Sequence, residues 1–227
     1  PIFATSTFEH GNKANFDYTR SGNPNFSILE NVLKGIENSN YCTVFNSGIS
    51  AVTAIVSSLK SGDIILCESN LYGCTIRMFE KIFRKFGIQT SYFDFTNKEY
   101  IQQISKVKPS LIWLESPTNP LLKILNLKEI CSEANLRKIP VVVDNTFCTA
   151  VIQKPLELGA TLSLISTTKF INGHSDALGG AVITNDESWN NKMIFSQKSL
   201  GLNPSPFDCW LITCLLYTSP SPRDPWK

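Results

Sequence analysis

Seven short apolar runs recur along the chain, each bounded by turn-forming or polar residues. Most of them are continuous rather than alternating, and they are rich in β-branched and aromatic side chains. Continuous runs of this length are typical of strands that are buried on both faces of a largely parallel sheet. The predicted strands are residues 41–45, 63–68, 88–93, 110–115, 140–144, 161–166 and 181–184.

Helical patterns fill most of the intervals between these runs. Residues 48–62 and 72–87 each end on a glycine, which is a common helix stop, and residues 126–138 carry apolar side chains at helical spacing. An amphipathic helix is also expected over residues 26–37. Strands that alternate with helices in this way predict a doubly wound α/β domain.

The two ends of the chain lack this alternation. Residues 1–25 are rich in Asn, Gly and Pro and have no hydrophobic period, which predicts an extended arm that packs on something else, such as another subunit. We expect the arm and first helix to span residues 1–39 and the main domain to span 40–213. Residues 214–227 include three prolines within six positions, and we expect them to be foreign to the original protein.

Composition excludes several classes of protein. The 227 residues are 42% hydrophobic and 18% charged, as in ordinary globular domains, and a net charge of +2 gives no footprint for nucleic acid or an anionic membrane. No apolar run approaches a membrane-spanning length. Seven scattered cysteines without a CxxC pair, and only two histidines, argue against a disulfide framework and a metal centre. This cysteine usage favours a reducing compartment, the cytoplasm.

Polar residues follow five of the predicted strands. In an open parallel sheet, ligands bind beyond the carboxyl ends of the strands. The strand ends carry, in order, an NSG turn that opens a helix at Gly48 and Ile49, then Tyr72, Asn119, Asp144, and finally Ser166, Thr168 and Lys169. Each has an ordinary explanation alone: a helix cap, a rim aromatic, a turn residue, a strand-end cap and a solvated lysine. Their occurrence together at one edge predicts a ligand site.

A lysine, an acid, an aromatic ring and a helix N-terminus together match the needs of pyridoxal 5′-phosphate. A deprotonated lysine forms a Schiff base with a carbonyl cofactor. An acid beneath the pyridine nitrogen keeps the ring protonated, which makes it an electron sink. Backbone N–H groups at a helix N-terminus bind a phosphate group.

Seven motifs resemble those of the Cys/Met-metabolism family of pyridoxal-phosphate enzymes, in family order, from about Pro1 to Thr213. They are YTRSGNPN, FNSGISA, LYGCT, LESPTNP, VVVDNTF, STTKFINGHSD and PSPFDCWL. The resemblance implies an α/β, fold type I, aminotransferase-like large domain with a mostly parallel seven-stranded sheet, assembled as a homodimer or homotetramer. It also implies that the small C-terminal domain of the relatives is missing from this chain.

The resemblance assigns roles to individual residues. Lys169 is implied to be the Schiff-base lysine and proton shuttle, Asp144 to pair with the pyridine nitrogen, and Tyr72 to stack on the ring and act in proton transfer. The other implied cofactor-binding residues are Gly48 and Ile49 through their N–H groups, Ser166 and Thr168 through their hydroxyls, Asn119 near the phenolic oxygen, and Tyr18 and Arg20, which reach the neighbouring subunit's phosphate site. His174 is interpreted as a structural brace for its turn.

The implied reaction is carbon–sulfur bond cleavage in trans-sulfuration, with a sulfur amino acid as substrate: γ-elimination from cystathionine gives cysteine, 2-oxobutanoate and ammonia. Methionine γ-elimination, cystathionine synthesis and O-acetylhomoserine sulfhydrylation are the alternatives. A non-catalytic protein of the same fold is disfavoured because Lys169 and Asp144 are both present. Cys74 is either a small packing residue or a thiol like that of methionine γ-lyases.

The chain alone is expected to have little activity. In relatives, the arginine that binds the substrate carboxylate lies in the C-terminal domain. We therefore expect weak cofactor binding and slow or no turnover from these 227 residues.

Overall fold

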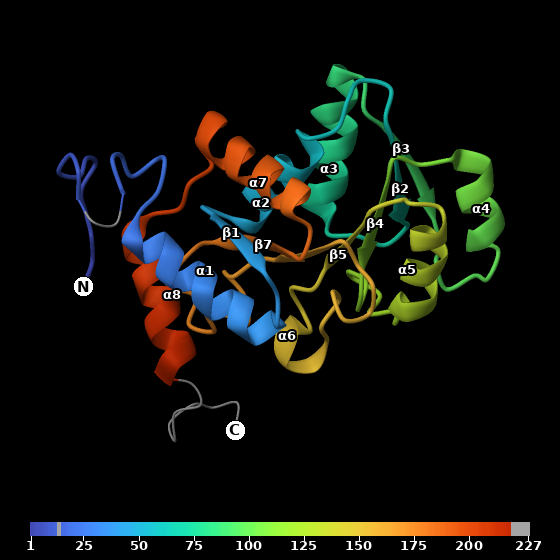
Figure 1. The fold of residues 1–227 in the computed structure, drawn as a ribbon. Helices are drawn as coiled ribbons and strands as arrows, with labels where there is room; N and C mark the ends of the chain where they lie inside the picture. Colours follow the sequence, from blue (N-terminus) through green and yellow to red (C-terminus); the bar gives the residue numbers. More distant parts are fainter. Residues whose placement is uncertain (13–14, 219–227) are drawn as a thin grey trace.

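A mixed, mostly parallel sheet lies at the centre of the molecule, with helices on both faces (Figure 1). The computed structural model describes residues 1–12 and 15–218, and within them the sheet has seven strands in the order β1-β7-β6-β5-β4-β2-β3. The strands are β1 Tyr41–Phe45, β2 Ile64–Glu68, β3 Gln89–Phe93, β4 Leu111–Glu115, β5 Val141–Asp144, β6 Leu162–Ile165 and β7 Gly180–Thr184. Each predicted strand is therefore confirmed, with its ends displaced by one residue at most.

The directions of the strands determine which edge of the sheet carries their carboxyl ends. β7 pairs antiparallel with both β1 and β6, whereas β2 pairs parallel with β3 and β4, β4 with β5, and β5 with β6. Because β7 separates β1 from β6, those two strands point the same way. The carboxyl ends of every strand except β7 therefore meet at one edge of the described sheet.

The helices occupy most of the predicted intervals. They are α1 Pro24–Glu37, α2 Gly48–Val56, α3 Gly73–Lys81, α4 Tyr100–Val107, α5 Leu127–Leu136, α6 Thr149–Ile152, α7 Glu187–Ser199 and α8 Pro206–Thr218, with a 3₁₀ turn, η1, at Phe83–Phe86. The predicted helix at 48–62 ends early, at Val56, where two serines follow. The Ser58 hydroxyl donates to the Ala54 carbonyl over 3.1 Å, so a side chain takes over a backbone acceptor near the helix end.

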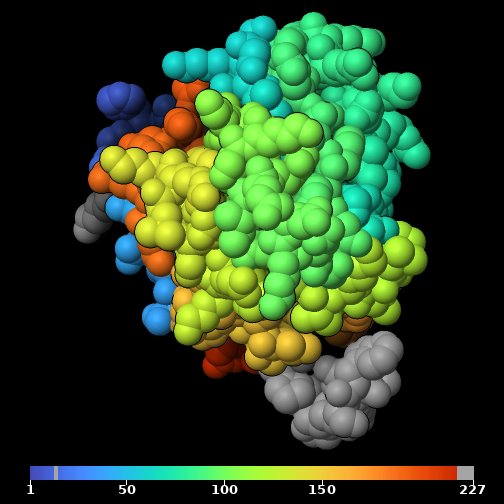
Figure 2. Space-filling view, turned by 90° about the vertical axis from the view of Figure 1, so that its right-hand side faces the viewer, coloured from blue at the N-terminus to red at the C-terminus, as the bar shows by residue number. Residues whose placement is uncertain are grey.

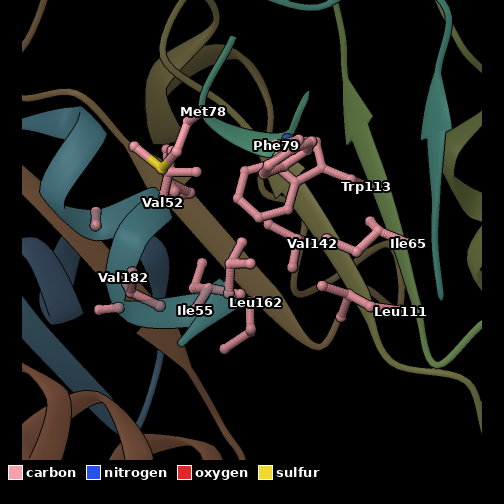
Figure 3. Packing of buried hydrophobic residues seen from close by; sticks show 14 of the residues in the cluster. Val52, Ile55, Ile65, Met78, Phe79, Leu111, Trp113, Val142, Leu162 and Val182 are labelled. Carbon is pink, nitrogen blue, oxygen red and sulfur yellow. The ribbon is translucent and has the colours of Figure 1, made fainter. Parts of the chain in front are cut away.

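Two apolar layers sandwich the sheet. One layer packs α2, α3 and α7 against the whole width of the sheet, and Figure 3 shows its centre, where Phe79 and Trp113 meet edge to face with ring centroids 5.2 Å apart. On the opposite face, α4 and α5 cover the middle strands, while α1 and α8 cover β1 and β7. In Figure 2 the middle of the chain, green on the colour bar, forms a continuous outer surface.

Side chains from two helices protect the outer edge of β1. A Glu30 carboxylate oxygen lies 3.2 Å from the Val44 N–H that donates to it, and Gln197 Nε2 donates to the Val44 carbonyl over 2.5 Å. These contacts satisfy backbone groups that an edge strand leaves unpaired. Burial raises the pKa of Glu30 from 4.5 to about 7, against the opposing effects of the Val44 N–H and the Lys34 ammonium.

We expect Glu30→Gln to stabilise the protein at alkaline pH. A raised acid pKa means that the folded state favours the protonated form, so the contribution of Glu30 to stability is complete below pH 4.5 and is lost as pH rises through about 7. Glutamine keeps an acceptor for Val44 and cannot ionise. In urea unfolding, the variant should match the wild type at about pH 4 and exceed it by on the order of 2 kcal/mol at pH 8.5. A difference that is the same at both pH values would contradict this account.

The N-terminal arm and the C-terminal helix lie outside the sheet. The arm is held by a bridge between Thr7 and Tyr18 and by the Phe3 N–H, which donates to Asn25 Oδ1 over 2.8 Å. At the other end, α8 runs without interruption past Cys214 to Thr218. The division at residue 213 stays a prediction, and the rest of the predicted foreign segment, 219–227, lies outside the described residues.

Among the described helices, none is long and apolar enough to cross a membrane. The seven cysteines, all within the described ranges, are free thiols.

Candidate functional site

The N-terminus of α2 and the segment after β6 meet at the carboxyl edge of the sheet. A Cβ added to Gly48 would lie 2.7 Å from the Ser166 Cβ and 2.9 Å from its hydroxyl oxygen, which is closer than side chains approach. Glycine is therefore required for this contact. The structure brings together two residues that lie 118 positions apart in the sequence.

This meeting point has the features of an anion site. Ser47 caps α2, and its side chain accepts from the Ser50 N–H over 3.2 Å. The N–H groups of Gly48 and Ile49 have no acceptor among the described residues, and the Ser166 hydroxyl makes no hydrogen bond there either. Free N–H groups at a helix N-terminus, next to a free hydroxyl, match what a phosphate group binds.

Asp144 is linked to Ser166 through Thr146. The Thr146 hydroxyl donates to Asp144 Oδ1 over 2.6 Å and accepts from the Ser166 N–H over 2.9 Å; the Thr146 N–H also donates to Asp144 Oδ1 over 3.1 Å. Burial raises the pKa of Asp144, and the two donors from Thr146 oppose that shift. The predicted ring-nitrogen partner is thus a buried acid held in one orientation.

Glu115 lies beside Asp144 at this edge and was not among the residues predicted from the sequence. It pairs in register with Asp144 across β4 and β5, and the Tyr72 N–H donates to Glu115 Oε2 over 2.7 Å. Burial, and then the charge of Asp144, raise the pKa of Glu115 to about 8. The signal was visible in the LESPTNP motif, where an acid ends an apolar run, just as Asp144 ends VVVD.

Tyr72 lies at the start of α3, where its side chain is 45% exposed. Hydrogen bonding with the Cys74 thiol is the main cause of a raised pKa for the Tyr72 phenol. The Cys74 sulfur in turn lies 3.7 Å from the Arg77 guanidinium. The phenol is therefore neutral near pH 7 and accessible from solvent.

Lys169 lies in a turn after β6. Its N–H donates to the Ser166 carbonyl over 3.3 Å, and its carbonyl accepts from the Gly173 N–H over 2.7 Å. The exposed ammonium group makes no hydrogen bond or ion pair with the part of the chain that the structure describes. Lys169 and Thr168 line an open groove of about 1440 Å³ whose walls include Phe147, Phe170 and other apolar side chains.

The remaining predicted residues lie in several places. The Thr168 hydroxyl donates to the Gly179 carbonyl over 3.2 Å and accepts from the Gly179 N–H over 3.1 Å, so it joins the lysine turn to β7. Asn119 is half-buried in a turn between cis peptide bonds at Pro117 and Pro120. These contacts leave the predicted cofactor roles of Thr168 and Asn119 untested.

The two arm residues contact their own chain. The Arg20 guanidinium stands 5.4 Å from the centre of the Tyr18 ring and donates to the Lys198 carbonyl over 3.0 Å. Their predicted role in a neighbouring subunit stays a prediction. His174 Nδ1 lies 2.8 Å from the Asn172 carbonyl oxygen, in agreement with its interpretation as a brace for the turn.

Known proteins are similar to this chain in sequence and in fold. A model of the family described as "Cys/Met metabolism PLP-dependent enzyme" matches residues 1–218. This chain belongs to that family. Membership confirms the resemblance inferred from the seven motifs, and the family depends on pyridoxal phosphate.

Relatives with three different reaction names are about equally similar. A probable cystathionine gamma-synthase from Herpetosiphon aurantiacus is 39% identical over 93% of this chain and 67% of its own length. Human cystathionine gamma-lyase is also 39% identical, over 93% of this chain and 53% of its own length. The crystal structure of apo CalE6, a methionine gamma lyase from Micromonospora echinospora, has a TM-score of 0.91 at 36% identity and covers 96% of this chain and 59% of that one. The chain thus spans roughly half to two thirds of the length of these relatives.

Proposed function

We propose that this chain is the cofactor-binding part of a pyridoxal-phosphate-dependent carbon–sulfur lyase that acts on cystathionine. One observation carries the proposal: an anion site, a buried acid and an unpaired lysine ammonium follow β1, β5 and β6 at one edge of the sheet in a member of this family. Cleavage of cystathionine by γ-elimination yields cysteine, 2-oxobutanoate and ammonia.

The residues present fit the cofactor. The close approach of Gly48 to Ser166 leaves no room for a side chain at position 48. The free N–H groups and the hydroxyl at this point suit the phosphate group of the cofactor. Asp144 offers a carboxylate to a protonated ring nitrogen, and the exposed Tyr72 ring offers a flat surface. Bound in this way, the cofactor supplies an electron sink for the substrate carbon next to the amino group.

Side chains of this chain would hold and move the protons. The Lys169 amine would hold the cofactor and, when free, would move a proton at the substrate carbons. Tyr72, whose phenol keeps its proton near pH 7, is proposed to assist proton transfer. Asn119 and Thr168 are proposed as additional cofactor contacts.

The proposed function includes an oligomeric state and a cellular compartment. We propose a homodimer or homotetramer in which Tyr18 and Arg20 of the arm reach the phosphate site of a neighbouring subunit. The exposure of both side chains supports this role. We also propose the cytoplasm as the compartment, because the cysteines of the described chain are unpaired.

The reaction can be tested by product analysis with purified chain and added pyridoxal phosphate. Cystathionine alone should give cysteine and 2-oxobutanoate, slowly because the chain spans only part of its relatives, and Lys169→Ala should give neither. The nearest alternative is cystathionine synthesis, which the similarity to a probable cystathionine gamma-synthase favours. Incubation with O-acylhomoserine and cysteine tests for this reaction. Formation of cystathionine in that mixture, without cleavage of added cystathionine, would replace the lyase by the synthase.

A further inference from the structure

Glu115 and Asp144 form a pair of buried acids at the ends of neighbouring strands. They stand opposite each other in the β4–β5 register and are 6% and 9% exposed. Side chains alternate along a strand, so both point to the sheet face that carries Trp113 and Val142. Two carboxylates this close in a buried place cannot both ionise cheaply.

The surrounding groups distinguish the two acids. Asp144 receives two hydrogen bonds, from the N–H and the hydroxyl of Thr146, whereas Glu115 receives one, from the Tyr72 N–H. Donors stabilise the charged form of a carboxyl group, so they favour the charge on Asp144. No lysine or arginine of the described chain offsets the burial of Glu115.

The next acid along the edge does not join the pair. Glu68 ends β2, but alternation places it on the opposite face from Cys67. Its carboxylate already accepts from the Ser69 hydroxyl over 2.8 Å and from the Phe95 N–H over 2.9 Å. Glu68 therefore lies apart from the pair that Glu115 forms with Asp144.

We propose that Glu115 stays protonated beside an ionised Asp144, so that the pair presents one negative charge to the ring nitrogen of the bound cofactor. The inference rests on the proposed function, because the cofactor brings the single positive charge that the pair would match. Glu115 is a positioning residue: it decides which acid carries the charge and holds the backbone of Tyr72. A glutamine at position 115 keeps an oxygen that accepts from the Tyr72 N–H, but it has no carboxyl proton to titrate.

Infrared titration of the cofactor-free protein tests the acid pair itself. The band of a protonated carboxyl group should persist at pH 7 and fade near pH 8, and the Glu115→Gln variant should lack this component. Asp144→Asn removes the neighbouring charge, so the Glu115 band should fade at least about one pH unit earlier. If Glu115→Gln removes no component that titrates near pH 8, or if Asp144→Asn leaves the midpoint of that component unmoved, the proposal is overturned.

Glu30 provides a matched control for the titration. It is another buried acid, with a pKa of about 7, but it contacts Val44 on β1 rather than the pair. The component lost in Glu30→Gln should therefore have the same midpoint with and without the Asp144→Asn change. A midpoint that moves with Asp144 would mean that the shift is general, which also overturns the proposal.

Cofactor affinity at pH 6.5 tests the assignment of the charge. Followed by tryptophan fluorescence, pyridoxal 5′-phosphate should bind Glu115→Gln within about twofold of the wild type and Asp144→Asn at least about tenfold more weakly. Equal weakening by both variants would place charge on Glu115 and overturn the inference. If neither variant weakens binding, the ring pairing in the proposed function fails, while the infrared result still decides whether the acids share a proton.

Discussion

Replacing Lys169 with alanine is expected to abolish covalent capture of pyridoxal 5′-phosphate. Reduction with borohydride makes the bond between the cofactor carbonyl carbon and a lysine amine permanent, so peptide mass spectrometry can locate it even when binding is weak. The wild-type chain should carry the label mainly on Lys169, whose ammonium has no partner in the described chain. The loss in Lys169→Ala should be at least about tenfold, because effective concentration favours a bound carbonyl over random collision.

Two comparisons make this result specific. Lys154 is a surface lysine whose ammonium lies 3.7 Å from a Glu157 carboxylate, so Lys154→Ala should leave labelling of Lys169 unchanged. Pyridoxal without its phosphate should label Lys169 much less, because the anion site at Gly48 would be unused. Label spread evenly over surface lysines would show that the edge of the sheet is not a cofactor site.

Replacing Gly180 with alanine is expected to be among the most destabilising single changes in the chain. A Cβ there would lie 2.4 Å from the Ser47 carbonyl oxygen and 2.8 Å from the Gly48 Cα. Both atoms are backbone, so no side chain can move aside, and β7 or the start of α2 must shift. Overpacking of this kind should cost roughly 3 kcal/mol or more, which corresponds to about 6–12 °C in melting temperature for a domain of this size.

Gly35 offers a matched control within α1. A Cβ at Gly35 would have no atom within 4 Å, and its backbone is helical. Gly35→Ala should therefore stabilise the protein by about 0.5–1 kcal/mol, since alanine loses less entropy in a helix. Urea unfolding of both variants should give changes of opposite sign. A Gly180→Ala variant as stable as the wild type would show that α2 is not held against β7 as described.

Strand positions and a mostly parallel sheet followed from the local pattern, whereas the reversed direction of β7 did not. The seven apolar runs predicted the strands because a strand buried on both faces must be apolar throughout. The same pattern fits parallel and antiparallel neighbours, so nothing in residues 181–184 indicated that β7 runs against β1 and β6. Direction depends on the connections that enter and leave the strand, here the lysine turn after β6 and the chain that leads into α7.

The ends of the helices are another feature that the local pattern did not predict. Residues 72–87 have one apolar pattern, yet α3 ends at Lys81 and a 3₁₀ turn follows. Phe83 packs into the layer beneath α2 and α3, so tertiary contacts favour a tighter turn than the pattern alone predicts.

By itself, the sequence determined the strand-forming runs, the family and the lysine, because each depends on residue type and order along one stretch of chain. Only the tertiary structure decided which groups meet. Glu115 beside Asp144, Gly48 against Ser166 and the link from Tyr72 to Glu115 all depend on register and on a closeness of backbones that no local pattern records. The physical reason is that proton sharing and anion binding depend on distances of a few ångströms between segments far apart in the chain, and packing sets those distances.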